Sequence, residues 1–370
     1  MIKPKPAIKF PFYAQATLVL LGLCAFVSIL FFAGQIIVPV IYATILAIVL
    51  TPIVNFFVEK KMNRIVAISL TVFLTMLTVI LLVALLSNQL MQFSAAFPKL
   101  GDKFNQLSDQ TIHWASQRFN MSPQKMNGWM AEKKTEVLSK TGTVVAQTIL
   151  NTGSVLIVMF LIPVYVFMIL YYRPLLIEFV HKLFSTNNQG EVNDILKAIK
   201  IIIQSYLVGL LLEACIIATL NSASLLLLGI ESAILIGVIG AVLNVIPYIG
   251  GIIAVALPMV MALVTKSPSY ALLVLGAYLL IQFVDNHLII PKVVASKVKI
   301  NALISVIAVL AGNALWGIAG MFLSIPLTAI IKVICDHVEP LKPLGFLLGN
   351  TVPTTSRFTF TKLKPKKQAV

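Results

Sequence analysis

The chain has little charge. Only 11% of its 370 residues are Asp, Glu, Lys or Arg, 59% are hydrophobic, and the mean hydropathy is +0.98. A soluble domain carries about 25% charged residues. The shortage of charge therefore excludes an ordinary soluble protein and predicts an all-α polytopic membrane protein, because lipid requires every backbone polar group to be bonded internally.

Motifs of nucleotide hydrolysis and of common hydrolases are also missing. The chain has no Gly-rich phosphate loop followed by Lys and Ser or Thr, so it does not hydrolyse ATP by itself. It has no His-Glu-x-x-His and no Gly-x-Ser-x-Gly sequence. The three cysteines, Cys24, Cys215 and Cys335, have no metal or redox spacing. We therefore expect no enzyme, no cofactor and no metal.

Acidic residues are scarce, with 13 Asp and Glu against 28 Lys and Arg. The basic residues flank apolar runs and do not alternate with aromatic residues, so nucleic acid is not expected as a partner. They include Lys3, Lys5, Lys9, Lys60, Lys61, Arg64, Arg357, Lys362, Lys364, Lys366 and Lys367. The positive-inside rule then places both termini in the cytoplasm. Anionic lipid headgroups would attract the basic C-terminal tail.

Long apolar runs dominate what is present, and about 20 apolar residues suffice to span a bilayer. The continuous runs lie at about 14–34, 36–57, 65–91, 149–172, 201–229 and 269–290. Alternation from a cytoplasmic N-terminus places the polar residues after the third run outside the cell. Apolar side chains there recur at gaps of three and four, which predicts an amphipathic helix. This helix would pack on its own protomer, lie among lipid headgroups, or contact a neighbouring subunit.

These patterns divide the chain into four parts. Residues 1–91 hold three transmembrane helices, and residues 92–147 form an extracytoplasmic helical insertion. Residues 148–350 form a transmembrane transport region, and residues 351–370 a basic cytoplasmic tail.

Two apolar segments of the transport region, 231–264 and 302–334, are longer than a simple span and are interrupted by Gly or Pro. Broken backbone survives in lipid only if it is buried in protein or lines a wet cavity. A pair of broken segments is a pointer to a transporter's binding site. If both broken segments cross the membrane, they and the six continuous runs give about eight spans. The lysines between 291 and 301 favour re-entrant segments instead, and the lengths permit either.

Two carboxylates lie within or close to spans, Glu213 and Asp285. A charge at the bilayer centre costs about 2.5–3.5 kcal/mol, so it is expected to be functional or paired. For Glu213 a substrate, proton or cation role and a structural hydrogen bond are equally compatible with the sequence. For Asp285 a functional role is favoured over an interfacial cap or salt bridge.

Amides accompany these acids: Asn244 and Asn313 lie at the two breaks, and Gln282 and Asn286 lie beside Asp285. An amide binds a polar solute, or satisfies unwound backbone, without adding charge. The predicted substrate or ion pathway consists of Glu213, Asn244, Gln282, Asp285, Asn286 and Asn313. The predicted helix-break residues, which allow open or closely packed backbone, are Pro247, Gly250, Gly251, Gly317, Gly320 and Pro326.

Three motifs, Gly240–Gly250, Asp285–Lys292 and Gly317–Leu327, are similar to the signatures of the autoinducer-2 exporter (AI-2E) family of bacterial permeases. The resemblance extends over nearly the whole chain. It implies a homo-oligomeric secondary transporter of the bacterial inner membrane. Members of that family are associated with export of the quorum-sensing signal autoinducer-2, and some resemble sodium/proton antiporters in activity.

Three functions remain open from the sequence. Export of a small polar signal molecule leads, and cation/proton antiport is second. A membrane scaffold or regulatory protein, which would recruit partners through its insertion and tail, is the third.

Overall fold

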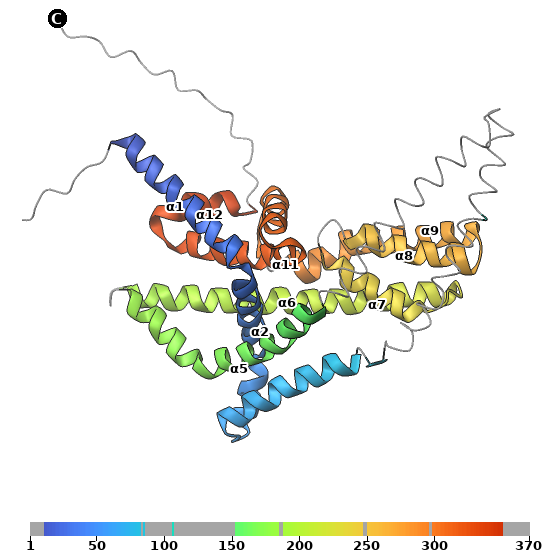
Figure 1. Ribbon diagram of the computed structural model, residues 1–370, viewed down its shortest axis with the longest axis horizontal. Coiled ribbons are helices and arrows are strands. Elements are labelled where there is room, and N and C mark those ends of the chain that lie inside the picture. Colours follow the sequence, from blue (N-terminus) through green and yellow to red (C-terminus); the bar gives the residue numbers. More distant parts are fainter. Residues whose placement is uncertain are drawn as a thin grey trace, which may run out of the picture.

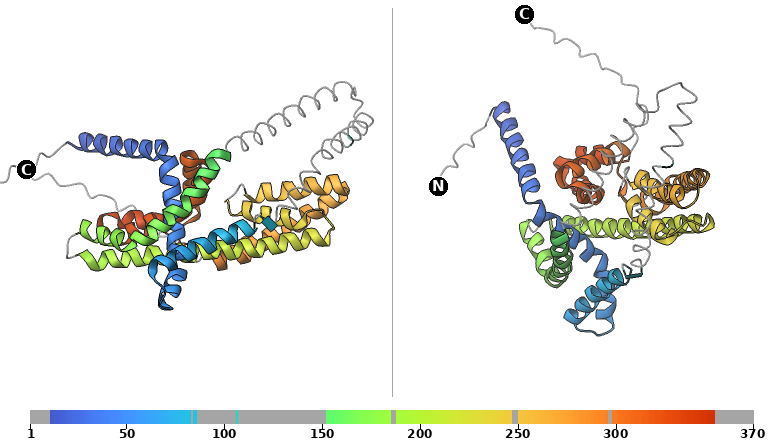
Figure 2. Two further views of the ribbon diagram at one scale, coloured as in Figure 1. Left: turned by 60° about the horizontal axis from the view of Figure 1, so that its bottom comes forward. Right: turned by 45° about the vertical axis from the view of Figure 1, so that its right-hand side comes forward.

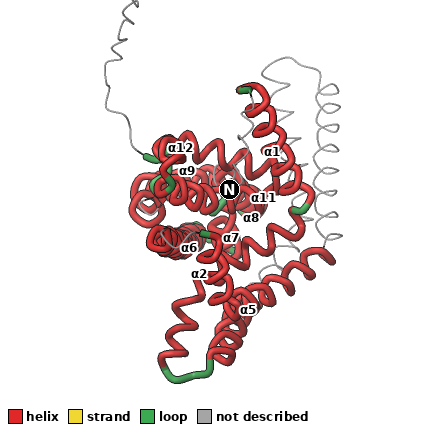
Figure 3. Tube along the Cα trace, turned by 90° about the vertical axis from the view of Figure 1, so that its left-hand side faces the viewer, coloured by secondary structure: helices red, strands yellow, loops and turns green. Residues whose placement is uncertain are grey.

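The computed structural model describes residues 11–82, 84, 85, 106, 152–184, 188–246, 250–295 and 298–350. These residues are helical almost throughout, joined by short loops, and none of them forms a strand (Figure 3). The all-α prediction is therefore confirmed. The predicted insertion 92–147, apart from residue 106, and the tail 351–370 lie outside the described residues.

Seven helices in the described part are long and apolar enough to cross a membrane. They are α1 (Phe12–Phe32), α2 (Gly34–Glu59), Arg64–Leu82, the Phe160–Leu183 part of α5 (Thr152–Leu183), α6 (Gln189–Leu227), Pro268–Val294 and α11 (Ala302–His337). Pro268–Val294 contains α9 (Pro268–Val284), followed by the π-helical turns η2 (Asp285–Ile289) and η3 (Pro291–Ala295). The chain is thus a multi-pass membrane protein.

The remaining apolar helices are shorter. The first broken segment forms α7 (Ala233–Asn244) and α8 (Gly250–Thr265), of 12 and 16 residues. At 1.5 Å per residue they are about 18 and 24 Å long. Each is shorter than a hydrocarbon layer of about 30 Å. This is why the structure has seven helices of spanning length among its described residues and not the eight spans that the sequence predicts.

The α7–α8 break brings two backbones into contact. A Cβ atom added to Gly250 would lie 1.8 Å from the carbonyl oxygen of Leu243, so only glycine permits this approach. The close contact joins the end of α7 to the start of α8 as a helical hairpin. Figure 1 shows α7, α8 and α9 stacked beside the C-terminal part of α6. A buried apolar core holds these helices together: Leu225, Ile230, Ala233, Ile236, Met261, Ala262, Ala271, Val274 and Tyr278.

The second broken segment bends within α11. Trp316 and Gly317 have non-helical backbone angles, and Gly317 has a φ of +60°. A Cβ on Gly320 would lie 1.9 Å from the carbonyl oxygen of Gly312, although the two residues are eight positions apart in sequence. Because residues eight apart in a straight helix are about 12 Å apart, α11 folds back on itself at this point. Its 36 residues are therefore long and apolar enough to cross a membrane but do not form one straight helix.

Proline in α2 leaves a carbonyl group without its helical donor, and another helix supplies one. Pro52 has no N–H to bond the Ile48 carbonyl four residues earlier. The Gln204 Nε2 atom of α6 donates to that carbonyl at 2.6 Å. The polar side chain of Gln204 therefore removes the cost of a broken helical bond in an apolar environment.

The same arrangement recurs in α5. Pro174 frees the Leu170 carbonyl, and Arg64 Nη2, at the start of the next helix after α2, donates to it at 2.9 Å. Arg64 thus joins two helices that are distant in sequence.

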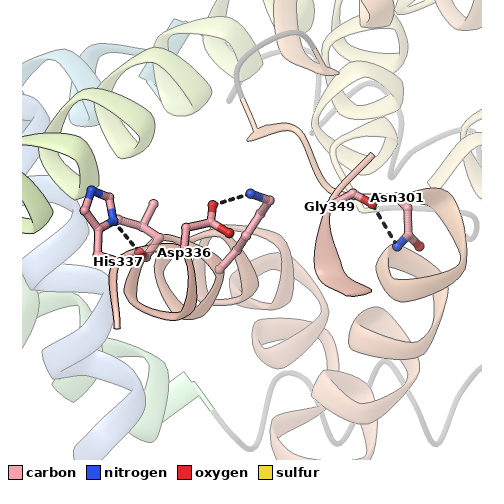
Figure 4. A network of polar contacts seen from close by, with 6 residues as sticks. Asn301, Asp336, His337 and Gly349 are labelled. Carbon is pink, nitrogen blue, oxygen red and sulfur yellow. Dashed lines mark hydrogen bonds and ion pairs between the residues drawn. The ribbon is translucent and has the colours of Figure 1, made fainter. Parts of the chain in front are cut away.

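The C-terminal helix α12 (Lys342–Leu348), which follows the 3₁₀ turn η4 (Glu339–Leu341), is tied to the start of α11. Asn301 caps α11 by accepting from the Ile304 amide at 2.9 Å. The Asn301 Nδ2 atom donates to the carbonyl oxygen of Leu347 at 2.7 Å. It also donates to the carbonyl oxygen of Gly349 at 3.2 Å (Figure 4). One side chain therefore completes a helix N-terminus and fixes the C-terminal segment.

Helix α1 has no buried residue. Figure 2 shows it leaning away from the other described helices. Its C-terminal end is nevertheless attached, because Trp316 Nε1 of α11 donates to the Leu30 carbonyl at 2.8 Å.

Candidate functional site

A cavity of about 700 Å³ lies where α6, α7, α8, α9 and α11 meet. Polar side chains line part of it: Tyr206, Glu213, Asn244, Tyr278, Gln282, Asn286 and Ser305. Apolar residues such as Leu210, Val255, Val294, Ile300 and Ile325 line most of the rest. Small-molecule sites have this size and composition, a mostly apolar wall with a few placed polar groups.

Asp285 is fully buried behind this wall. It is 0% exposed, and its Oδ2 atom accepts from Asn244 Nδ2 at 2.9 Å. Asn244 is the last residue of α7, and Asp285 is the first residue of η2. The hydrogen bond therefore joins the first helix break to the first π-helical turn. The other carboxylate oxygen, Oδ1, has no hydrogen-bond partner among the described residues.

Gly251, on α8, allows two amide oxygens to approach the same place. A Cβ there would lie 3.2 Å from Gln282 Oε1 and 3.6 Å from Asn244 Oδ1. The amide nitrogens are engaged elsewhere: Asn244 donates to Asp285, and Gln282 Nε2 donates to Asn286 Oδ1 at 3.4 Å. Both amides line the cavity, and the carbonyl oxygen of each lies close to Gly251.

Glu213 brings a second carboxyl group to the cavity from the middle of α6. It is 4% exposed and lines the cavity. Glu213 therefore lies on the cavity wall, whereas Asp285 is buried behind it.

The structure brings five of the six predicted pathway residues together. Glu213, Asn244, Gln282 and Asn286 line the cavity, and Asp285 contacts it through Asn244. Asn313 does not join them: it is exposed on α11 and is absent from the cavity wall. The roles of the five clustered residues in a pathway remain predictions.

The predicted helix-break residues divide between the two hairpins. Gly250 and Gly251 lie at the start of α8, and Gly317 and Gly320 at the fold of α11. Pro326 is buried further along α11. Pro247 lies outside the described residues.

Two tyrosines of the cavity wall were not predicted from the sequence. Tyr278 lies one helical turn before Gln282, and its buried hydroxyl has no hydrogen-bond partner among the described residues. Tyr206 lies two turns before Glu213 on α6. Spacings of four and seven residues place each tyrosine on the helix face of a predicted polar residue, which is the signal that would have found them.

Discontinuous helices around a partly polar cavity, within a multi-pass bundle, define a class of protein, the membrane transporters. The particular family follows from comparison with known sequences. The model of the AI-2E family transporters matches residues 18–339. The chain therefore belongs to this family.

Named relatives agree with this assignment. The chain is 26% identical to the "Putative transport protein YhhT" of Escherichia coli (strain K12) over 322 residues, 86% of this chain and 89% of the relative. It is 25% identical to the "AI-2 transport protein TqsA" of the same strain over 324 residues, 86% of this chain and 91% of the relative. A shorter match to the "Putative transport protein YrrI" of Bacillus subtilis (strain 168) is 33% identical over 132 residues, 36% of this chain and 37% of the relative.

Proposed function

We propose that this protein is a secondary transporter that moves a small polar solute through the cavity between α6 and the α7–α8 hairpin. The observation that carries the proposal is the cluster of Glu213, Asn244 and Gln282 on the wall of a cavity of about 700 Å³ in a membrane protein. A purely structural apolar bundle has no need of three polar side chains around one space, because each costs free energy to bury.

The leading substrate is a small polar signal molecule such as autoinducer-2, exported across a bacterial inner membrane. The name of the relative TqsA, an AI-2 transport protein at 25% identity, supports this substrate. The absence of an ATP-binding motif supports secondary transport.

Flux of autoinducer-2 into vesicles reconstituted with the purified chain tests the proposal. We expect Gln282→Ala to reduce the flux about tenfold, the effect of losing about one good hydrogen bond. Asn313→Ala is the matched control, since Asn313 is exposed and absent from the wall, and it should transport as wild type does. Equal loss in both variants, or no flux in the wild type, would contradict the proposal.

Cation/proton antiport is the second candidate, favoured by the two buried carboxyl groups of Glu213 and Asp285. A sodium gradient across the vesicle membrane should then change the internal pH. We expect Asp285→Asn to reduce this proton flux strongly and Glu213→Gln to reduce it less. Wild-type dependence on pH in both purified variants would remove the antiport candidate.

A chain that moves neither solute nor protons would act as a membrane scaffold or regulator.

A further inference from the structure

The two amides of the cavity wall turn the same kind of atom toward the space between them. Asn244 Oδ1 and Gln282 Oε1 lie around Gly251, with 3.6 and 3.2 Å to the position of a Cβ atom there. On this arrangement, and on the proposed function, we propose that the cavity selects uncharged solutes rich in hydroxyl groups and rejects anions. Asn244 and Gln282 are the residues that determine this specificity.

The partner of Asn244 fixes the direction of its amide. Asp285 accepts from Asn244 Nδ2 at 2.9 Å, and a carboxylate has acceptors only. Turning the Asn244 amide over would place its oxygen against a carboxylate oxygen in a fully buried position, and such an acceptor pair is repulsive. Asp285 therefore holds one N–H of Asn244 and fixes the amide so that its oxygen lies on the side of Gly251.

The amide of Gln282 is also oriented by a hydrogen bond from its nitrogen, although this bond is longer. Its Nε2 atom donates to Asn286 Oδ1 at 3.4 Å, one helical turn along the chain. Gly251 has no side chain to cover the Gln282 oxygen. A solute between α8 and α9 would therefore meet the carbonyl oxygens of Asn244 and Gln282 beside Gly251.

The charged groups around the cavity also favour uncharged solutes over anions. Among its described lining residues there is no Lys, Arg or His, and Glu213 is the lining acid. Hydroxyl and amide donors also line the wall, on Tyr206, Tyr278, Ser305 and Asn286. A carboxylate or phosphate on the solute would still lie beside the Glu213 carboxyl group, with no cation among the described lining residues to balance its charge. Hydroxyl groups can donate to the two amide oxygens, so an uncharged polyol is matched where an anion is not.

The experiment compares ribitol with ribonate, which have the same five-carbon chain but differ by one CH₂OH replaced with a carboxylate. Thermal unfolding of the purified full-length protein reports binding, because a ligand that binds the folded state raises Tm. We expect ribitol to raise Tm and ribonate, at equal concentration and ionic strength, to leave it unchanged. The affinities should differ at least about tenfold.

Variants separate binding in the cavity from the general stabilising effect of a polyol. Asn244→Ala and Gln282→Ala should each lose the shift produced by ribitol. Asn313→Ala, at the other helix break, should keep it. A shift that survives both wall variants is a solvent effect, and equal shifts from ribitol and ribonate mean no charge selection. Either result overturns the inference, as does the absence of any shift with ribitol.

This readout does not depend on transport. Selective binding of ribitol without flux of autoinducer-2 in vesicles would leave the specificity in place and remove the proposed substrate. Flux of autoinducer-2 without selection against ribonate would leave the proposed function in place and remove this specificity.

Discussion

At the scale of single residues, the side chains of Gln204 and Arg64 donate to backbone carbonyl groups that prolines leave without a helical donor. The sequence predicts a cluster of Asp285, Asn244 and Gln282, because a polar residue in a span is costly unless it has a partner. It does not predict which amide atom faces the cavity. That direction depends on the approach of α7 to η2, a contact between residues 41 positions apart.

Glycine at the breaks gives the first prediction. Gly250→Leu and Gly320→Leu should abolish transport while the chain still inserts into the membrane, because a Cβ would lie 1.8 Å and 1.9 Å from backbone oxygens. Overpacking of this kind costs about 1–3 kcal/mol or more. Vesicle flux and membrane fractionation measure the two effects.

The matched control for these variants is Gly22→Leu on α1, where an added Cβ has no neighbour within 4 Å. This variant should insert and transport as wild type does. Unaltered flux in both hairpin variants would remove the basis for placing the site beside the breaks.

Gln204 and Pro52 give a prediction on stability. Gln204→Leu should lower the free energy of unfolding by about 1–3 kcal/mol, because it leaves the Ile48 carbonyl without a donor. In a Pro52→Ala background the same change should cost less, since an alanine at this position has an amide N–H that can bond the Ile48 carbonyl. Thermal unfolding of the four proteins forms a double-mutant cycle. Additive effects in that cycle would show that Gln204 does not act through the carbonyl freed by the proline.

At the scale of elements, the sequence identified both broken segments but not their shapes. A break in an apolar run is visible as Gly, Pro and Asn, so the interruptions near Gly250 and Gly317 could be placed in advance. Whether a segment folds back depends on backbone contacts such as that of Gly312 with Gly320. Small residues allow such a contact but do not by themselves require it.

The attachment of α12 gives an element-scale prediction. Asn301→Ala removes a helix cap together with two hydrogen bonds to the C-terminal segment. We expect a loss of about 1–2 kcal/mol in local stability. Faster amide hydrogen exchange over residues 342–349 would report it.

Lys342→Ala is the control for this change. It removes an exposed ion pair with Glu339, and such pairs contribute little. Exchange over α12 should stay at the wild-type rate in this variant. Equal protection of α12 in wild type and Asn301→Ala would mean that the apolar packing of α12 holds it without the asparagine.

At the scale of the whole molecule, composition was enough to predict a helical membrane protein, because the bilayer leaves few other ways to bond a backbone. Orientation in the membrane still rests on the distribution of charge. We predict that residues 92–147 lie outside and that both termini lie in the cytoplasm.

Labelling of single cysteines from outside the cell tests this topology. In a background without Cys24, Cys215 and Cys335, a cysteine at position 120 should react with an impermeant reagent, and one at position 368 should not. Labelling at position 368 but not at position 120 would reverse the orientation.

Helix α1 has a consequence for how the protein responds to its bilayer. None of its residues is buried by the other described helices, so lipid sets its tilt. Its 21 residues are about 31 Å long, close to the thickness of a hydrocarbon layer. A thinner or thicker bilayer would tilt α1 or deform around it. Because Trp316 holds the end of α1 through the Leu30 carbonyl, at the fold of α11, membrane thickness would act directly on the second hairpin.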